Sequence, residues 1–416
     1  MFDENANLSE SLTFDLAIVG GGIVGATLAS ILKTTGLKIA LIEALPPEQA
    51  LFKPQAYAIS LLSSRIFKGI GIWSQILPKI GKFAHIRLSD ADYAGIVPFA
   101  KTDLQTEALG YVGEHQIILA ALQDNLPPSS HLQWIRPAEV IAVDYQPEQA
   151  VLTIKQNQTE SKIQAKLVIG ADGAKSRLRS LAGIQTKGWK YWQSCVAFTI
   201  RHQAPRNDIA FERFWYSGPM GVLPLPDNRC QIVWTLPHAQ AQALTATDEA
   251  DFLQQLQTRL GGSLGPISLV SPRRLFPVQL MQSDRYIQPR LALVGDAAHC
   301  CHPVGGQGLN MGIRDAAALA EVIQTAFEQG EDFGSLGVLK RYERWRKPEN
   351  LIILGFTDLL DRLFSNDWLL IVLIRRLGLG ILAQFAPVKI LALKLMTGLL
   401  GRQPRLAQPY TKFLNT

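Results

Sequence analysis

The sequence contains few cysteines, and their spacing excludes two classes of protein. Its 416 residues include four cysteines, two of them adjacent at Cys300 and Cys301. Secreted disulfide scaffolds carry many spaced cysteines, and structural zinc sites carry C-x-x-C pairs. Neither pattern is present, so we expect reduced thiols and no metal site.

Runs of one charge are also missing. The formal net charge is +6, but the basic residues form no cluster larger than the pairs Arg273-Arg274 and Arg375-Arg376. Nucleic-acid binding usually requires a compact basic patch, so we expect no nucleic-acid partner. With 47% hydrophobic and 18% charged residues, general disorder is excluded and a large buried interior is expected.

No uncharged hydrophobic run reaches the ~20 residues that a membrane-spanning helix needs. Residues 369–400 are very apolar, but Lys and Arg residues interrupt them. Residues 1–15 are acidic and polar, without the apolar core of an export signal. We therefore expect no spanning helix and a cytoplasmic location.

A strand-turn-helix-strand pattern opens the chain. The apolar run 14–19, the helix-like segment 23–32 and the second apolar run 38–43 predict a βαβ unit. The six residues from Gly20 to Gly25 match G-x-G-x-x-G at the turn between the first strand and the helix. Strand, turn and helix therefore stand in the order that a dinucleotide fingerprint requires.

Each position in this fingerprint has a physical purpose. Gly20 permits the tight turn, Gly22 lets the backbone approach a pyrophosphate, and Gly25 permits close helix packing. Glu43 ends the second strand ~20 residues further on, where an acid accepts hydrogen bonds from the adenosine ribose. The motif predicts a dinucleotide but does not distinguish NAD from FAD.

Two later strand-like runs, 166–169 and 291–294, each end in a turn of small residues with an aspartate. The aspartates are Asp172 in Gly-Ala-Asp-Gly and Asp296 in Gly-Asp-Ala-Ala. A glycine-rich segment, 303–312, then leads into a helix. We expect these separated segments to meet at one ligand.

In this order and at these separations, the motifs resemble the class A flavoprotein monooxygenases, which have the para-hydroxybenzoate hydroxylase-like fold and bind one FAD. The resemblance implies an α/β protein with a Rossmann-like FAD-binding domain, an inserted β-sheet substrate domain and C-terminal helices. The fingerprint and the resemblance together assign FAD binding to Gly20, Gly22, Gly25, Glu43, Asp172, Gly295, Asp296, Gly306, Gly308, Leu309 and Asn310.

The glycine-rich segment is expected to face the flavin itself. Helix starts offer free N–H groups to negative charge, and Leu309 and Asn310 are the expected main-chain donors to the flavin edge that gains charge on reduction. By the resemblance, Pro303 lies beside the reactive carbon of the flavin. We assign these three residues to the catalytic environment and no side chain as acid or base.

Nearly the whole chain also resembles the ubiquinone-biosynthesis hydroxylases within this class. The resemblance implies that NAD(P)H or another donor reduces FAD, and that O₂ is then used to hydroxylate the aromatic ring of a prenylated phenol or quinone precursor. A reductase of the same fold and a non-catalytic flavoprotein of a quinone-biosynthesis complex are the alternatives. The resemblance to the ubiquinone-biosynthesis hydroxylases rests on the motifs Ala58-Ile59-Ser60, Leu109-Gly110-Tyr111, Ala210-Phe211-Glu212-Arg213-Phe214, Gly218-Pro219, Leu223-Pro224-Leu225-Pro226 and Val233-Trp234.

Some residues leave alternatives open. Relatives often carry arginine where this chain has Gln55, so contacts at that position are uncertain. Glu212 and Arg213 either contact the substrate or form an ion pair on an exposed sheet. His299 and His302 lack accompanying metal ligands, and we interpret them as structural or flavin-lining.

The C-terminal segment allows two arrangements. Its apolar residues either pack on the core or lie in a membrane interface on the inner face of a membrane, with Arg375, Arg376, Lys389, Lys394 and Arg402 near anionic headgroups.

The pattern predicts the following domain organisation: 14–85, 109–185 and 273–345 as segments of the FAD-binding domain, 86–108 and 186–272 as the substrate domain, and 346–416 as a C-terminal helical region.

Overall fold

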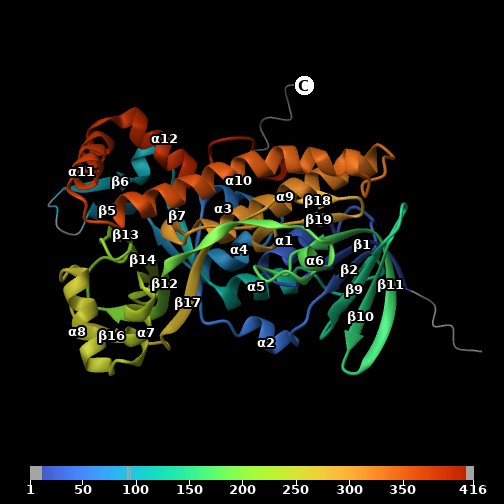
Figure 1. The fold of residues 1–416 in the computed structure, drawn as a ribbon, viewed down its shortest axis with the longest axis horizontal. Coiled ribbons are helices and arrows are strands. Elements are labelled where there is room, and N and C mark those ends of the chain that lie inside the picture. Colours follow the sequence, from blue (N-terminus) through green and yellow to red (C-terminus); the bar gives the residue numbers. More distant parts are fainter. Residues whose placement is uncertain (1–11, 91–92, 94, 409–416) are drawn as a thin grey trace, which may run out of the picture.

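A computed structural model describes residues 12–90, 93 and 95–408 of the protein (Figure 1). Most of the polar N-terminal segment, from which we expect no export signal, lies outside these residues. So do the last eight residues of the predicted C-terminal region, 409–416.

The first sheet is built on parallel strands. Its central strands are buried on both faces, which explains why β2 (Ile39–Ile42) is an uninterrupted apolar run. Helix α1 (Ile23–Leu32) packs against α9 (Gln307–Glu328) and α5 (His115–Asp124). The strand order is β18 (Ile287–Gln288), β19 (Leu291–Leu293), β11 (Thr159–Gly170), β1 (Leu12–Val19), β2 (Ile39–Ile42) and β8 (Leu132–Ile135), with β10 (Ala150–Gln156) and β9 (Glu139–Tyr145) extending from β11.

The second sheet is largely antiparallel and has its own apolar core beneath α7 (His238–Ala246) and α8 (Glu249–Leu260). The side chain of Asp248 caps the start of α8, and Gly261, with φ of +62°, ends the helix. The strand order is β20 (His299–Cys300), β17 (Arg274–Ser283), β12 (Thr186–His202), β15 (Arg229–Pro237), β14 (Met220–Leu225), β13 (Ile209–Phe214), β5 (His85–Asp90) and β6 (Ile96–Ala100), with β16 (Ile267–Leu269) beside β12.

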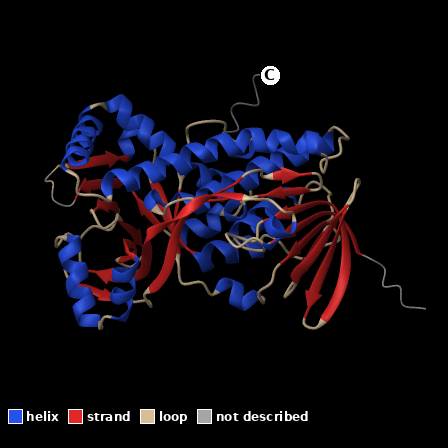
Figure 2. Ribbon diagram, in the orientation of Figure 1, coloured by secondary structure: helices blue, strands red, loops and turns tan. Residues whose placement is uncertain are grey.

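A small third sheet, β3 (Ala56–Ile59), β7 (Gly110–Glu114) and β4 (Gly81–Phe83), lies between these two parts of the chain. The architecture confirms the predicted α/β fold class, with a Rossmann-like sheet, an inserted β-sheet lobe and C-terminal helices (Figure 2). Strand β17 belongs to the second sheet because it pairs with β12 along both lobes, whereas we assigned 273–345 to the FAD-binding domain. The domain boundaries stay a prediction.

Three helices end the described chain. Helix α10 (Leu336–Phe364) runs along one side of the molecule from the first sheet toward the second (Figure 1), so it crosses the predicted boundary at 345. Helices α11 (Leu369–Gln384) and α12 (Ala386–Met396) cover the end of the β-sheet lobe. Within the described ranges, no single helix has the length and apolar character to span a bilayer, and α11 and α12 meet at a bend of 98°.

The basic residues of this region do not all lie as the membrane-interface arrangement, one of the two left open by the sequence, would place them. Arg375 is buried, with its Nε 2.8 Å from Oδ2 of Asp90, and only Lys394 of the five is exposed without an ion partner among the described residues. The other four form ion pairs with acidic side chains of the protein, Arg375 and Arg376 with Asp90, Lys389 with Asp103, and Arg402, whose side chain stays exposed, with Glu321.

Candidate active site

The sequence motifs meet at one edge of the first sheet. Strand β11 lies between β1 and β19, and all three are parallel, with Val19 opposite Gly170 and Gly170 opposite Leu293. The carboxyl ends of parallel strands point to one edge, so the turns that follow them are neighbours. The structure brings the ends of these distant segments together, and that they meet at one ligand stays a prediction.

The fingerprint glycines divide into two kinds. A Cβ atom on Gly25 would lie 1.9 Å from the carbonyl oxygen of Gly20, and one on Gly20, whose φ is +109°, would lie 2.3 Å from that of Ala171. Backbone contact therefore excludes side chains at both positions. A Cβ on Gly22 would meet no atom within 4 Å, which leaves the backbone open to a phosphate group.

Glu43 fixes the same loop. Its Oε2 accepts a hydrogen bond from the N–H of Gly21 at 2.7 Å, and its Oε1 accepts one from Leu45 at 2.9 Å. A carboxylate has about four acceptor positions, so Glu43 keeps capacity for ribose hydroxyls beside the loop.

The two aspartates differ in what they contact. Asp172 accepts a hydrogen bond from the N–H of Leu178 at 3.1 Å, at the start of α6 (Arg177–Leu181). Asp296 faces a cavity, and no hydrogen-bond donor of the described residues reaches its carboxylate. Desolvation by the surrounding protein raises the pKa of Asp296, although His299 and Lys53 oppose the shift.

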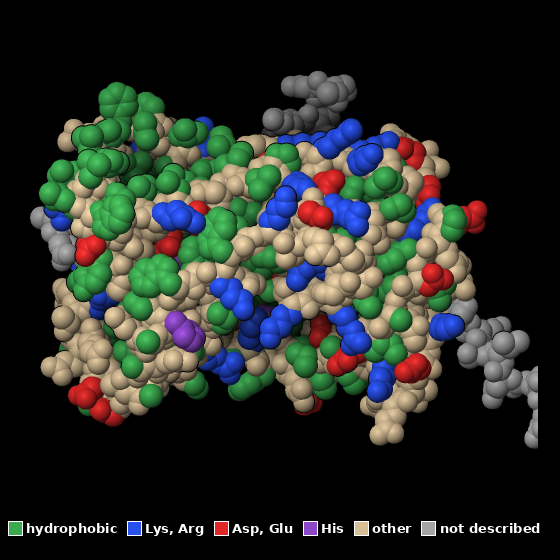
Figure 3. All heavy atoms as spheres, in the orientation of Figure 1, with side chains coloured by type: hydrophobic (Ala, Val, Ile, Leu, Met, Phe, Trp, Pro, Cys, Tyr) green, Lys and Arg blue, Asp and Glu red, His purple; other side chains and the backbone are tan. Residues whose placement is uncertain are grey.

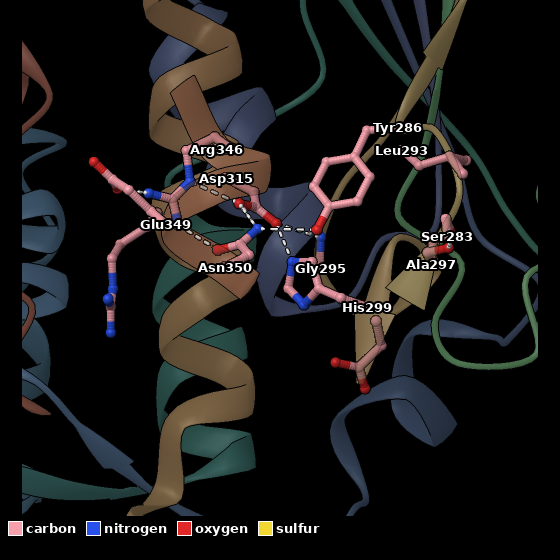
Figure 4. A network of polar contacts seen from close by, with 12 residues as sticks. Ser283, Tyr286, Leu293, Gly295, Ala297, His299, Asp315, Arg346, Glu349 and Asn350 are labelled. Carbon is pink, nitrogen blue, oxygen red and sulfur yellow. Dashed lines mark hydrogen bonds and ion pairs between the residues drawn. The ribbon is translucent and has the colours of Figure 1, made fainter. Parts of the chain in front are cut away.

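A buried polar network holds the Asp296 turn in place (Figure 4). Oδ2 of Asp315 on α9 accepts hydrogen bonds from Nε2 of His299 at 2.6 Å and from the N–H of Gly295 at 3.1 Å. Its Oδ1 accepts from Nε of Arg346 at 2.8 Å and from Nδ2 of Asn350 at 3.0 Å. Burial disfavours the charge, but His299 and Arg346 outweigh burial and hold the pKa of Asp315 well below its usual range. His299 therefore has a structural partner.

Helix α9 begins at Gln307, directly after two glycines with left-handed backbones. Gly305 has φ of +68° and Gly306 of +61°, conformations that other residues rarely adopt. The first N–H groups of a helix have no acceptor within it, and Gln307 and Leu309 supply them at a cavity wall. Asn310 is the fourth residue of α9, so its N–H has an acceptor within the helix, and Leu309 is the better placed of the two expected donors.

The side chain of Asn310 is fully used in holding β3 and α3 (Leu61–Gly69) against α9. Its Oδ1 accepts from the N–H of Ser60 and from Oγ of Ser63, both at 2.8 Å, and its Nδ2 donates to the carbonyl oxygens of Ala58 and Gly306, both at 2.8 Å. The amide therefore positions the start of α9 and offers nothing further to a ligand.

A cavity of ≈ 780 Å³ joins these turns to the β-sheet lobe. Among the residues assigned from the sequence, those in its wall are Gly22, Glu212, Asp296, Pro303, Gly306, Gly308, Leu309 and Asn310. Those outside its wall are Gly20, Gly25, Glu43, Asp172, Arg213 and Gly295. Apolar side chains of the second sheet and of α10 to α12 complete the wall, including Phe211, Phe214, Leu223, Leu360, Leu382 and Leu393.

Glu212 and Arg213 point in opposite directions, as neighbours on a strand do. Oε2 of Glu212 accepts a hydrogen bond from the N–H of Gly305 at 3.3 Å inside the cavity. Burial raises the pKa of Glu212 to about 7, and the Gly305 N–H opposes this. Arg213 instead donates to the carbonyl oxygen of Leu260. The two side chains form no ion pair.

A further set of polar side chains lies in the wall, and of these only Gln55 was noted in the sequence analysis. Lys53, Gln55, Tyr57 and His115 line the cavity, and the hydroxyl of Tyr57 lies 3.3 Å from Nδ1 of His115. These residues come from β3, the segment before it and the start of α5. None belongs to a motif of fixed spacing, so only the folded structure brings them to the site.

Comparison with known sequences agrees with this geometry. The family described as FAD binding domain matches residues 13–350. An uncharacterized protein of Synechocystis is 63% identical over 95% of both chains. Ubiquinone hydroxylase UbiL of Rhodospirillum rubrum is 36% identical over 94% of this chain and 91% of its own. The 3-demethoxyubiquinol 3-hydroxylase of Escherichia coli is 33% identical over 92% of this chain and 98% of its own.

Solved structures agree on the fold. The p-nitrophenol 4-monooxygenase of Pseudomonas putida superposes with a TM-score of 0.77, covering 94% of this chain and 99% of its own at 18% identity. The flavin-dependent monooxygenase PieE, solved with FAD and substrate, has a TM-score of 0.68 at 18% identity and covers 96% of this chain and 74% of its own. With the family match and these relatives, the chain belongs to the FAD-dependent aromatic monooxygenases, where it is related to the ubiquinone-biosynthesis hydroxylases.

Proposed function

We propose that the protein hydroxylates the aromatic ring of a prenylated phenol, a precursor of ubiquinone or of another isoprenoid quinone, with O₂ and reducing equivalents from NAD(P)H or another donor. The observation that carries the proposal is the continuous cavity, which links the nucleotide turns to an apolar lobe. The names of two relatives, both ubiquinone-type hydroxylases, support the substrate class.

The residues present fit FAD. We propose that Gly20, Gly22 and Gly25 form the pyrophosphate turn, with Glu43 beside the ribose and Asp296, without a protein partner, on the ribityl chain. The free N–H groups at the start of α9 would stabilise negative charge on the flavin edge. When bound, the flavin would supply the activation of O₂. Proposed neighbours of the flavin within the same set are Asp172, Gly295, Pro303, Gly306, Gly308, Leu309 and Asn310.

The protein's own part in such a reaction is to position the ring and to exclude water. The second sheet and the C-terminal helices provide an apolar enclosure with a single carboxylate, Glu212, in its wall on the side of the lobe. The side chains of Leu382 on α11 and Leu393 on α12 belong to this enclosure. A prenyl chain would therefore extend from the ring toward α11 and α12.

The outer face of these two helices suits a membrane surface. Residues at helical spacing on α11 are exposed, with Leu370 at 70% and Leu377 at 67%, while Arg375 and Lys389 turn inward to acidic partners. Figure 3 shows hydrophobic side chains gathered at the corner formed by α11 and α12. Because the cavity reaches the same helices, we propose that this face lies in a membrane interface and receives the apolar substrate there.

The membrane proposal is tested by vesicle flotation of the FAD-loaded protein. We expect co-flotation with neutral phosphatidylcholine vesicles and little dependence on salt, because four of the five cations of the region are already paired. Leu370→Asp with Leu377→Asp is expected to abolish flotation, and Leu181→Asp, at an exposed leucine of α6, to leave it unchanged. Equal flotation of both variants, or none by the wild type, would count against a lipid-facing role.

The hydroxylase proposal is tested by reconstituting the protein with FAD and incubating it aerobically with NAD(P)H and a short-chain prenylphenol. Flavin absorbance together with a hydroxylated product by mass is the expected result. Oxidation of NAD(P)H without an oxygenated product would favour a reductase. Full pathway activity in a flavin-free Asp296→Ala variant would favour a non-catalytic member of a quinone-biosynthesis complex.

A further inference from the structure

Glu212 has a position that FAD binding does not explain. Of the described residues in the cavity wall, Lys53, Asp296 and Glu212 are the charged ones. Asp296 belongs to a nucleotide turn, and Lys53 is close enough to affect its pKa. Glu212 comes from β13 in the other lobe, and apart from Thr235 the side chains on that side of the wall are apolar, among them Phe211, Phe214, Pro219, Leu223 and Val233.

Of the two carboxylate oxygens of Glu212, one accepts a hydrogen bond from the described residues. Oε2 accepts the hydrogen bond from the Gly305 N–H at 3.3 Å, and no donor of the described residues reaches Oε1. A carboxylate in an apolar enclosure is costly unless its oxygens are satisfied. The free oxygen therefore suits a substrate that brings its own hydroxyl group.

This inference rests on the proposed hydroxylase function. We propose that Oε1 of Glu212 accepts a hydrogen bond from the phenolic hydroxyl of the substrate and takes its proton while the ring is attacked. Because Glu212 accepts a hydrogen bond from Gly305 in the segment that leads into α9, a ring held by Glu212 lies beside the predicted flavin edge.

Glu212 takes up one proton and later returns it. Two electrons from NAD(P)H or another donor reduce O₂, one oxygen atom of which leaves as water while the other is transferred to the ring carbon as an electrophilic hydroxyl group. As this bond forms, the phenolic O–H bond breaks, its proton moves to Glu212, and the ring oxygen becomes a carbonyl. The ring then loses the hydrogen on the attacked carbon as a proton to solvent. Glu212 returns its own proton to the carbonyl oxygen, which restores an aromatic diol and the free carboxylate.

The electrostatics agree with this role. A general base works best when its pKa lies near the operating pH, and burial raises the pKa of Glu212 to about 7. The Gly305 N–H is the opposing contact, and the titratable side chain that faces Glu212 from β12 is Cys195. Burial raises the pKa of Cys195 to about 12, so it stays a neutral thiol. The base is the ionised form, so the rate should rise with pH through about 7.

A purely structural role, in which Glu212 only holds Gly305, makes different predictions. Glu212→Gln keeps an oxygen that accepts from the Gly305 N–H but removes the base. Glu249→Gln, at an exposed glutamate on α8 of the same lobe, is the matched control. If Glu212 only positions the segment, Glu212→Gln should behave like this control.

The first measurement needs no turnover. A prenylated 4-nitrophenol is bound to the FAD-loaded, oxidised protein, and its ionisation is followed by absorbance against pH. Since two adjacent groups cannot both carry negative charge without a penalty, we expect the bound phenol to ionise at higher pH in the wild type than in Glu212→Gln, by roughly one unit or more. Identical ionisation in the two proteins overturns the proposal.

The second measurement is the rate of hydroxylation against pH. Glu212→Gln should lose roughly 100-fold or more in kcat, together with the rise through neutral pH, and should recover with a fluorinated phenol that is already ionised. Its affinity for FAD should match that of Glu249→Gln. An unchanged pH profile overturns the proposal. If no protein yields a hydroxylated product but the probe still ionises differently, the proposed function fails while the contact between Glu212 and a phenol stands.

Discussion

Replacing Asp315 by asparagine tests how the Asp296 turn is held. Asp315 is fully buried and accepts four hydrogen bonds, two of them from the basic side chains of His299 and Arg346 (Figure 4). Asparagine removes the charge and one acceptor oxygen while keeping the volume. Arg346 is then left buried with Glu349 as its remaining acidic partner. Breaking a buried ion pair in this way costs on the order of 3–5 kcal/mol.

The effect should appear in both stability and FAD binding. We expect Asp315→Asn to lower the free energy of unfolding by about 3 kcal/mol and to weaken FAD binding, since Gly295 loses the acceptor that fixes the turn. Urea unfolding of the apoprotein and flavin fluorescence titration measure the two quantities separately. Asp208→Asn, which removes an exposed pair with Arg206, should change neither. A stability equal to that of the wild type would refute the role assigned to the network.

Three further predictions follow from the same contacts. Gly25→Ala should lower both stability and FAD affinity, because the new Cβ would overlap the carbonyl oxygen of Gly20. Gly22→Ala has open space around the new Cβ, so it should leave the thermal midpoint unchanged and weaken only FAD binding. Equal thermal midpoints for the two variants would contradict this. The pKa of Asp315 is depressed in the folded state, so the stability that its carboxylate contributes is present above its unfolded pKa and is lost as pH falls below about 4. In acid titrations, the free energy of unfolding should therefore fall less steeply in Asp315→Asn than in the wild type. Parallel curves for the two proteins would contradict this. Asp90→Asn should leave Arg375 unpaired and detach α11, which limited proteolysis would detect as faster cleavage after α10, while protection equal to the wild type would contradict it.

The parts of the fold that the sequence predicted have local causes. A strand, a glycine turn and a helix within 30 residues are encoded by neighbouring residues, and parallel pairing then brings the ends of β1, β11 and β19 to one edge. The nucleotide side of the site could therefore be predicted from short motifs. The alternation of side chains along β13 also requires that Glu212 and Arg213 face opposite ways.

The parts that the sequence did not predict depend on long-range packing. Strand alternation does not say which of Glu212 and Arg213 faces the cavity, because that depends on where the Gly305 segment lies. Lys53 and His115 reach the site only through tertiary contacts. Arg375 on α11 and Lys389 on α12 turn inward because Asp90 and Asp103, nearly 300 residues earlier in the chain, lie beneath them.

The most direct test of the central claim is the origin of the oxygen in the product. The FAD-loaded protein is incubated with NAD(P)H, a short-chain prenylphenol and isotope-labelled O₂, and the product is analysed by mass spectrometry. The account predicts a ring-hydroxylated product that carries one labelled oxygen atom from O₂. Consumption of NAD(P)H with no labelled product, in a protein shown to hold FAD, would contradict it.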